Sequence, residues 1–113
     1  MKPSLRACLT AEVREFHLCP LSVAEIAFKW RQGRLPGVPD PVHWMDHALQ
    51  DCALEVPSVT ACRQAGLWDW SHGDLVDRIL AAIAAETGLV LLHTDTVLKG
   101  LSGFPQRYFP NAD

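Results

Sequence analysis

Three acidic residues stand where a short apolar run gives way to a predicted helix: Glu25, Asp77 and Asp95. In an open α/β fold, ligands gather at the edge of the sheet where strands end and helices begin. Three carboxylates at that edge would repel one another by about 3 kcal/mol per pair, for a separation of about 5 Å and an effective dielectric constant of about 20. A hard divalent cation with oxygen ligands offsets this repulsion, so the placement predicts a site for Mg²⁺ or Mn²⁺.

The segments before and around Glu25 must position the first of these acids. Residues 16–21 form a short apolar run that predicts a strand, and Ser22 with Glu25 three residues later is typical of a capping box. The helix that this box opens is predicted to continue to about Gln32, before a glycine and a proline-rich loop. Further upstream, the spacing of apolar residues predicts another helix over residues 3–13.

Between Glu25 and Asp77, the sequence predicts two helices and a brief strand. Asp40, followed by proline, is a favourable N-cap and predicts a helix over residues 42–52. Residues 53–56 are a brief strand candidate that ends at a proline. Ser58 is then predicted to cap a helix over residues 59–68.

The strongest helical pattern in the chain positions Asp77. It covers residues 75–87 and places four aliphatic side chains on one face, Val76, Ile79, Leu80 and Ile83. Gly88 is suited to end this helix. Residues 89–92 form a continuous apolar run, typical of a strand covered on both faces, and Asp95 follows it. The alternation of strands and helices predicts an α/β fold with a parallel sheet.

Length and composition set the class of protein. A chain of 113 residues suits a single domain, residues 1–113, with one modest core. Its net charge of −3 gives no overall attraction to nucleic acid. No apolar run reaches the roughly 20 residues needed to cross a bilayer, and the N-terminus has no apolar signal-peptide core. The four cysteines have no paired spacing, so we expect buried free thiols in a cytoplasmic protein.

With these residues in view, the chain resembles the PIN-domain family, specifically the VapC-type toxins of type II toxin–antitoxin systems. The similarity runs from about Leu5 almost to the C-terminus. Its most specific segments are SVAEIAFK at 22–29 with GRL at 33–35, HGDLVDRIL at 72–80, and GLVLLHTD at 88–95. The last two of the three acids are 18 residues apart (95 minus 77), as the family arrangement leads one to expect.

The resemblance implies a PIN-like three-layer α/β/α domain with a small parallel sheet. It also implies a metal-dependent endoribonuclease that is silenced by a cognate antitoxin, is expected to form a homodimer, and contacts no membrane. It assigns Glu25, Asp77 and Asp95 as catalytic, metal-coordinating carboxylates, and adds Asp74 to the metal set as a neighbouring acid. Mg²⁺ (or Mn²⁺) in such a site would lower the pKa of a bound water and offset charge on the RNA phosphate under attack.

The chain departs from the family pattern at three places. The family begins with a hydrophobic strand that ends in an aspartate ligand, and no such segment precedes Leu5, so we expect an N-terminally truncated domain that is weak or inactive as a nuclease. His93 stands where many relatives have threonine, and the tail from Gly103 onward is a poor candidate for the last strand. The alternative function is therefore a non-catalytic module that binds an antitoxin or a partner toxin chain, consistent with the excess apolar surface of the helix over 23–30.

Each candidate acid also has an interpretation that involves no chemistry. Glu25 could complete a capping box. Asp74 and Asp77 could be first-turn acids favoured by the helix dipole, and Asp95 could cap a short helix over residues 96–101.

Other polar and aromatic residues admit two interpretations as well. Lys29 and Arg78, close to the acids, are expected to contact phosphate, or else to lie on a solvated face. His43 and His47 have a zinc-compatible spacing without an evident third ligand, which favours a structural role. Four tryptophans are expected in the core or a dimer interface: Trp30, Trp44, Trp68 and Trp70. The alternative is base stacking by Trp68 or Trp70.

Overall fold

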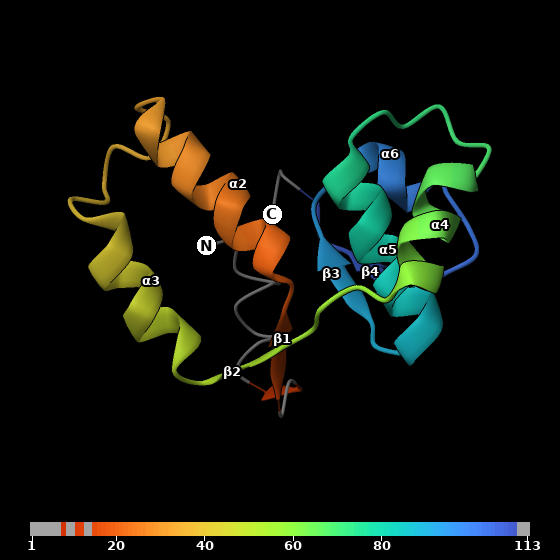
Figure 1. Ribbon diagram of the computed structural model, residues 1–113, viewed down its shortest axis with the longest axis horizontal. Helices are drawn as coiled ribbons and strands as arrows, with labels where there is room; N and C mark the ends of the chain where they lie inside the picture. Colours follow the sequence, from red (N-terminus) through yellow and green to blue (C-terminus); the bar gives the residue numbers. More distant parts are fainter. Residues whose placement is uncertain (1–7, 9–10, 13–14, 111–113) are drawn as a thin grey trace. The chain divides into compact units, whose positions relative to one another are not determined.

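The computed structural model describes residues 8, 11–12 and 15–110, so the helix predicted over residues 3–13 lies mainly outside the described residues. The described elements are, in chain order, β1 (Phe16–Leu18), α2 (Pro20–Arg31), α3 (Pro41–Leu49), β2 (Cys52–Leu54), α4 (Val59–Leu67), α5 (Leu75–Thr87), β3 (Leu91–His93), α6 (Thr96–Lys99) and β4 (Gln106–Tyr108) (Figure 1). The chain is thus mixed α/β, as predicted.

The described strands form two sheets of two strands each, and both pairs are parallel. In one, Phe16 lies opposite Cys52, and in the other Leu91 lies opposite Gln106. The chain divides into two compact units: a larger unit of residues 1–13 and 57–113, and a smaller unit of residues 14–56. The expectation of a single domain stays a prediction.

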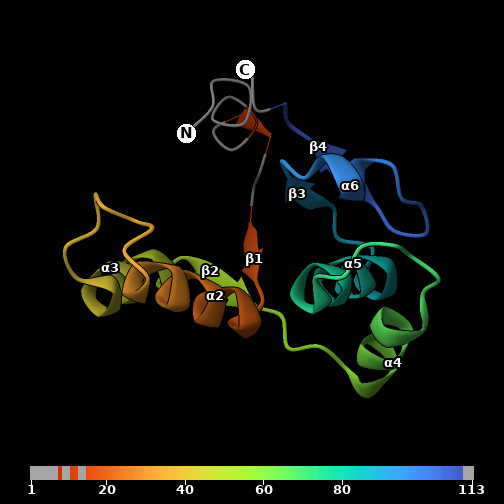
Figure 2. The ribbon, with the colours of Figure 1, turned by 90° about the horizontal axis from the view of Figure 1, so that it is seen from above.

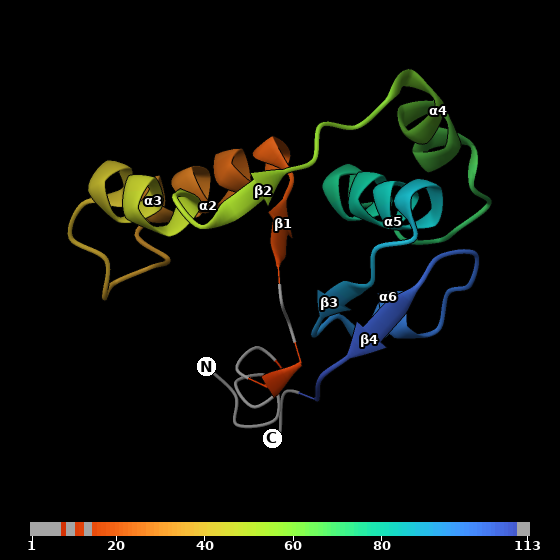
Figure 3. The ribbon, with the colours of Figure 1, turned by 90° about the horizontal axis from the view of Figure 1, so that it is seen from below.

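In the larger unit, α5 lies between α4 and the β3–β4 pair (Figures 2 and 3). The predicted limits of this helix are confirmed at both ends: Asp74 is its N-cap, and Gly88 follows it with φ 78°, a left-handed conformation that glycine adopts without strain. Its buried side chains are Ile79, Ala81, Ala82, Ile83 and Ala84. Facing them are the buried Ala61 and Ala65 of α4, and these small side chains let the two helices approach closely.

Ser58 caps α4 as predicted, since its Oγ accepts a hydrogen bond of 3.0 Å from the backbone N–H of Ala61. The same hydroxyl donates to Glu86 at 2.7 Å, near the end of α5. One side chain therefore joins the start of α4 to the end of α5, which reinforces the packing of the two helices.

In the smaller unit, the predicted capping box of Ser22 and Glu25 is wrong. The helix begins two residues earlier, at Pro20, with Cys19 as an N-cap that makes no side-chain cap bond. Proline is favoured at the first helical position because its φ is already helical and its missing N–H would have no partner there. Glu25 is therefore in the second turn of α2 rather than in its first.

Asp40 is confirmed as the N-cap of α3, with Oδ1 accepting from the N–H groups of Val42 and His43. The loop before α3 is fixed by Trp30, whose indole N–H donates to the Val38 carbonyl at 2.6 Å. Trp30 therefore has a structural contact within the smaller unit, but Trp30 and Trp44 are both exposed rather than in the core, and a place for them in a dimer interface stays a prediction.

The strand predictions need correction at their ends. β1 stops at Leu18 because Pro20 opens a helix, and β2 and β3 each differ from the predicted run by one or two residues. The tail from Gly103, predicted to be a poor strand, contains β4, so that prediction is wrong. Pairing with β3 supplies the missing stabilisation: the N–H of Leu91 donates to Pro105, and that of Phe109 to His93.

No disulfide joins any of the four cysteines, as predicted, but only two of them are buried. Cys8 and Cys19 are buried, Cys52 is half-buried, and Cys62 is exposed. In the part of the chain that the structure describes, no helix is long and apolar enough to span a bilayer.

Candidate metal centre

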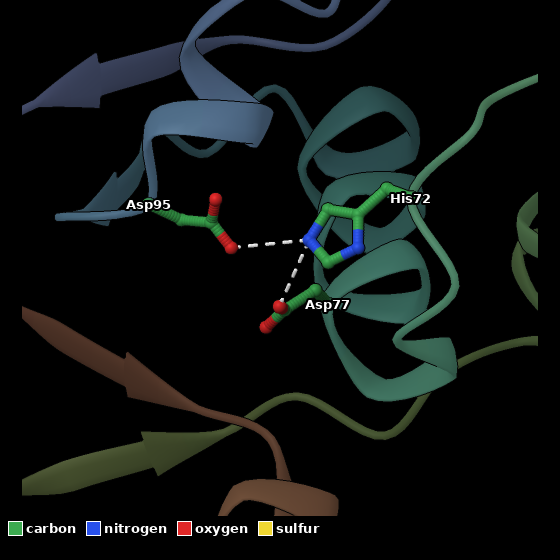
Figure 4. A group of neighbouring side chains, drawn as sticks. All are labelled: His72, Asp77 and Asp95. Carbon is green, nitrogen blue, oxygen red and sulfur yellow. Dashed lines mark hydrogen bonds and ion pairs between the residues drawn. The ribbon is translucent and has the colours of Figure 1, made fainter.

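Two of the predicted acids, Asp77 and Asp95, converge on one histidine in the larger unit (Figure 4). Nε2 of His72 lies 3.1 Å from Oδ2 of Asp95 and 3.2 Å from Oδ2 of Asp77. The three potential ligand atoms all lie within 4.8 Å of one another. At that separation, and with an effective dielectric constant of about 20, the two carboxylates repel by about 3 kcal/mol. A shared positive or hydrogen-bond-donating group between them offsets this cost.

Asp95 both caps a helix and faces His72. It follows β3 and is the N-cap of α6, where its Oδ1 accepts hydrogen bonds of 2.7 Å from Val97 and 3.2 Å from Leu98. Its other oxygen, Oδ2, faces His72. The cap thus fixes the carboxylate and leaves one oxygen directed toward Asp77, which suits monodentate binding of a cation.

The pKa of Asp95 is lowered from its ordinary value by this arrangement. Partial desolvation by itself raises the pKa, but hydrogen bonds from the backbone of Val97 and Leu98 and from His72 stabilise the charged form and outweigh it. Asp95 is therefore an anion at neutral pH, which is the form that a metal ligand requires.

His72 is a functional candidate that the sequence reasoning missed. Its Nδ1 accepts a 3.2 Å hydrogen bond from the backbone N–H of Asp74, so Nδ1 carries no proton. The remaining proton of the neutral ring is on Nε2, which donates to Asp95 and also lies 3.2 Å from the carboxylate of Asp77. In this state His72 is a hydrogen-bond donor that bridges two anions.

Arg78 holds the loop that delivers His72. Its Nε donates to Ala65 at 2.6 Å, and its two terminal nitrogens donate to the carbonyls of Gly66, Trp68, Trp70 and His72. A guanidinium has five N–H donors, and here each has a carbonyl partner. The predicted phosphate contact by Arg78 would require breaking this set, so we assign the residue a structural role.

The aromatic residues of the same loop support that role. Trp68 and Trp70 stack with ring centroids 4.0 Å apart, and Phe104 lies against both. Arg78 lies over the Trp70 ring at 5.8 Å. Each of these tryptophans thus has a ring partner within the larger unit, so their contacts favour packing over base stacking.

Of the remaining predicted site residues, Asp74 has a carboxylate oxygen within 4.8 Å of one of Asp77. Asp74 caps α5, with Oδ1 accepting from Val76 and Asp77, as its non-catalytic interpretation predicts. Glu25 and Lys29 lie on α2 of the smaller unit, half-buried and exposed respectively. Their assigned roles as metal ligand and phosphate contact stay predictions.

The His43–His47 pair of α3 lines a cavity of about 460 Å³ together with Pro39, Asp40 and Trp44. None of the groups of three or more potential ligands among the described residues includes either histidine. A zinc site built on this pair would therefore have two ligands, fewer than the three or four of protein zinc sites.

The donor set of Asp77 and Asp95 fits a hard divalent cation. Mg²⁺ is usually held in proteins by one or two carboxylates, with water and substrate phosphates completing its octahedron. Both carboxylates retain exposed surface, 25% for Asp77 and 32% for Asp95, so a hydrated ion can reach them.

Comparison with known proteins adds no family to this description: no protein-family model, curated protein or solved structure matches the chain.

Proposed function

We propose that this protein is a metal-dependent endoribonuclease, the toxin of a toxin–antitoxin pair, with a PIN-like three-layer α/β/α fold. Asp77 and Asp95 would hold Mg²⁺ or Mn²⁺. The observation that carries the proposal is the approach of these two carboxylates, 18 residues apart in the sequence, to within 4.8 Å. The choice of RNA as substrate and of an antitoxin and a second copy of the chain as partners follows from the resemblance.

The chemistry of the donor set supports this reaction class. A divalent ion held by two carboxylates supplies Lewis-acid stabilisation of the charge on a phosphodiester. Asp95 keeps its orientation through the cap on α6, so its Oδ2 is preorganised for a cation. The exposed side of the pair leaves room for a phosphate group, and Lys29 is proposed as a phosphate contact.

The first test is metal binding by variants that keep the helix caps. Asp77→Asn and Asp95→Asn remove one charge each with little change in shape, and asparagine remains a good N-cap at position 95. We expect Mn²⁺ affinity and RNA cleavage to fall by at least about 10–100-fold, the loss typical of disturbing the surroundings of a metal. Asp40→Asn, which keeps its cap on α3 in the smaller unit, is the matched control.

Glu25→Gln tests the remaining ligand that the resemblance assigns. If RNA is cleaved at the same rate by Asp77→Asn, Asp95→Asn and Glu25→Gln as by the unaltered protein, the nuclease proposal is overturned. Divalent ions should also raise the melting temperature of the unaltered protein and leave that of Asp77→Asn unchanged.

A non-catalytic interaction module is the second candidate function. It is favoured by α2, which has no buried residue and exposes 60% of Phe28 and 36% of Trp30. Apolar surface of this kind, if not needed for a core, is suited to a protein partner. A melting temperature that responds to neither Mg²⁺ nor Mn²⁺, in the unaltered protein and in Asp77→Asn alike, would support the module over the nuclease.

A further inference from the structure

His72 shares the place between Asp77 and Asp95 that a cation would need. Its Nε2 is within 3.2 Å of an oxygen from each carboxylate, and its Nδ1 accepts from the backbone of Asp74. Two roles are open to a histidine in this position: to be a third metal ligand, or to hold the two carboxylates together until a metal replaces it. The hydrogen bonds of the ring distinguish the two roles.

A metal ligand role conflicts with the contact at Nδ1. If Nε2 gives its lone pair to a metal, the proton of the neutral ring must be on Nδ1, where ligating histidines usually donate it to a carbonyl or a carboxylate. Here Nδ1 faces the N–H of Asp74, which is itself a donor. Two donors would then point at each other, so this backbone geometry disfavours ligation by His72.

The loop that carries His72 resists a simple change of this geometry. Arg78 binds the carbonyl of His72 itself at 3.0 Å and those of Trp68 and Trp70 before it. Asp74, which supplies the N–H, is fixed as the N-cap of α5. The backbone on both sides of the ring is therefore held, and the side chain is the part that can move.

We propose that His72 is a gating residue of the candidate metal centre and not one of its ligands. In the metal-free protein its Nε2–H bridges Asp77 and Asp95 and keeps their oxygens directed at each other. A divalent cation must displace this proton donor, so His72 lowers the affinity of the site while preserving its shape. This inference rests on the proposed function, since it assumes that the two carboxylates bind a metal.

Metal affinity of His72 variants tests the gate. Removal of the competing donor in His72→Ala should tighten Mn²⁺ binding, measured by titration with electron paramagnetic resonance, by about tenfold, the factor that about 1.4 kcal/mol represents. His72→Gln keeps a side-chain N–H donor and should stay within a few-fold of the unaltered protein. His43→Ala, in the smaller unit, controls for loss of an adventitious histidine contact. Equal or weaker binding by His72→Ala overturns the gate.

The position of the ring proton gives a second readout that requires no substitution. In ¹⁵N-resolved NMR spectra of the full chain, His72 should have its proton on Nε2 without metal and keep it there when Mg²⁺ is saturating. A change to the Nδ1–H form on addition of Mg²⁺ would make His72 a ligand and overturn the proposal. A ring protonated on Nδ1 before any metal is added would do the same.

The two proposals fail in different ways. If the unaltered protein binds Mn²⁺ and His72→Ala binds it more weakly, the gate is wrong and the metal centre stands. If neither protein binds Mn²⁺ at millimolar concentration and Asp77→Asn leaves RNA cleavage unchanged, the metal centre is wrong, and the gate is overturned with it.

Discussion

Two helices of the larger unit begin with the same three-residue pattern, His-x-Asp, and use it differently. In His72-Gly73-Asp74 before α5 and in His93-Thr94-Asp95 before α6, the aspartate is the N-cap and its backbone N–H donates to Nδ1 of the histidine. Both rings therefore have their proton on Nε2. The local device is shared, so any difference in role comes from what each Nε2–H and each carboxylate meets.

The partners of the two rings differ in charge. Nε2 of His93 donates to the neutral Oε1 of Gln106 at 2.6 Å, which ties β3 to β4. Nε2 of His72 instead meets the carboxylates of Asp77 and Asp95. The His93 ring is thus a structural joint between strands, whereas the His72 ring lies in the candidate metal centre, to which Asp95 also belongs. A repeated local motif can serve either purpose, and the neighbours decide.

The largest expected loss of stability comes from replacing Arg78, which binds the carbonyl of His72. Arg78→Ala leaves five carbonyls without their charged donor. We expect a loss of about 3 kcal/mol in the free energy of unfolding, measured in urea. A hydrogen bond to a charged group is worth about 1.5–3 kcal/mol, and several of the freed carbonyls can bind water instead. Arg78→Lys keeps the charge but has three donors, and should recover part of the loss. NMR should show changed ring signals for His72 and unchanged ring signals for His93. Equal changes at both rings would contradict the separate roles of the two histidines.

The two capping aspartates should differ when both are replaced by alanine. Asp74→Ala loses a helix cap, worth about 1 kcal/mol. Asp95→Ala loses its cap and the bond from His72 as well, so we expect about 2 kcal/mol. Thermal unfolding of the two variants in metal-free buffer measures the difference. Equal losses would mean that the His72–Asp95 contact contributes nothing to stability.

Gln106 tests whether the His93 ring has only a structural role. Gln106→Ala removes the acceptor of His93 and a 2.7 Å bond to the Leu101 carbonyl, which should cost about 1 kcal/mol in urea unfolding. Because this contact lies outside the carboxylate pair, Mn²⁺ affinity should remain at the unaltered value. A large fall in affinity would show that the His93 ring also supports the metal centre.

The smallest expected effect is on the pH dependence of stability. The pKa of Asp95 is lowered in the folded protein, so between its folded pKa and its ordinary value of 3.8 the unfolded chain binds more protons. Its contribution is therefore fully present above that ordinary value and is lost as the pH falls through the folded pKa. The stability difference between the unaltered protein and Asp95→Asn should be larger at pH 7 than at pH 3. A stability difference that is independent of pH would show that the charge of the Asp95 carboxylate does not stabilise the folded protein.

Much of the local structure could be predicted because neighbouring residues determine it. The limits of α5 follow from its aliphatic stripe, from Asp74 before it and from Gly88 after it, all within the helix or next to it. The caps of Asp40 and Ser58 are equally local. The helix start predicted at Ser22 is wrong, because Pro20 is favoured as the first residue of α2.

The sequence by itself determined where the helices begin and which acids stand at their ends, since caps and periodicity act over a few residues. Tertiary structure decided the rest. The pairing of β4 with β3 and the bond from His72 to Asp95, 23 positions away, exist only because distant segments are brought together. The sequence favoured Asp95 over Asp74 as a ligand because an apolar run precedes Asp95, although both aspartates cap a helix after a histidine. Only the tertiary structure places Nε2 of His72 between the carboxylates of Asp95 and Asp77.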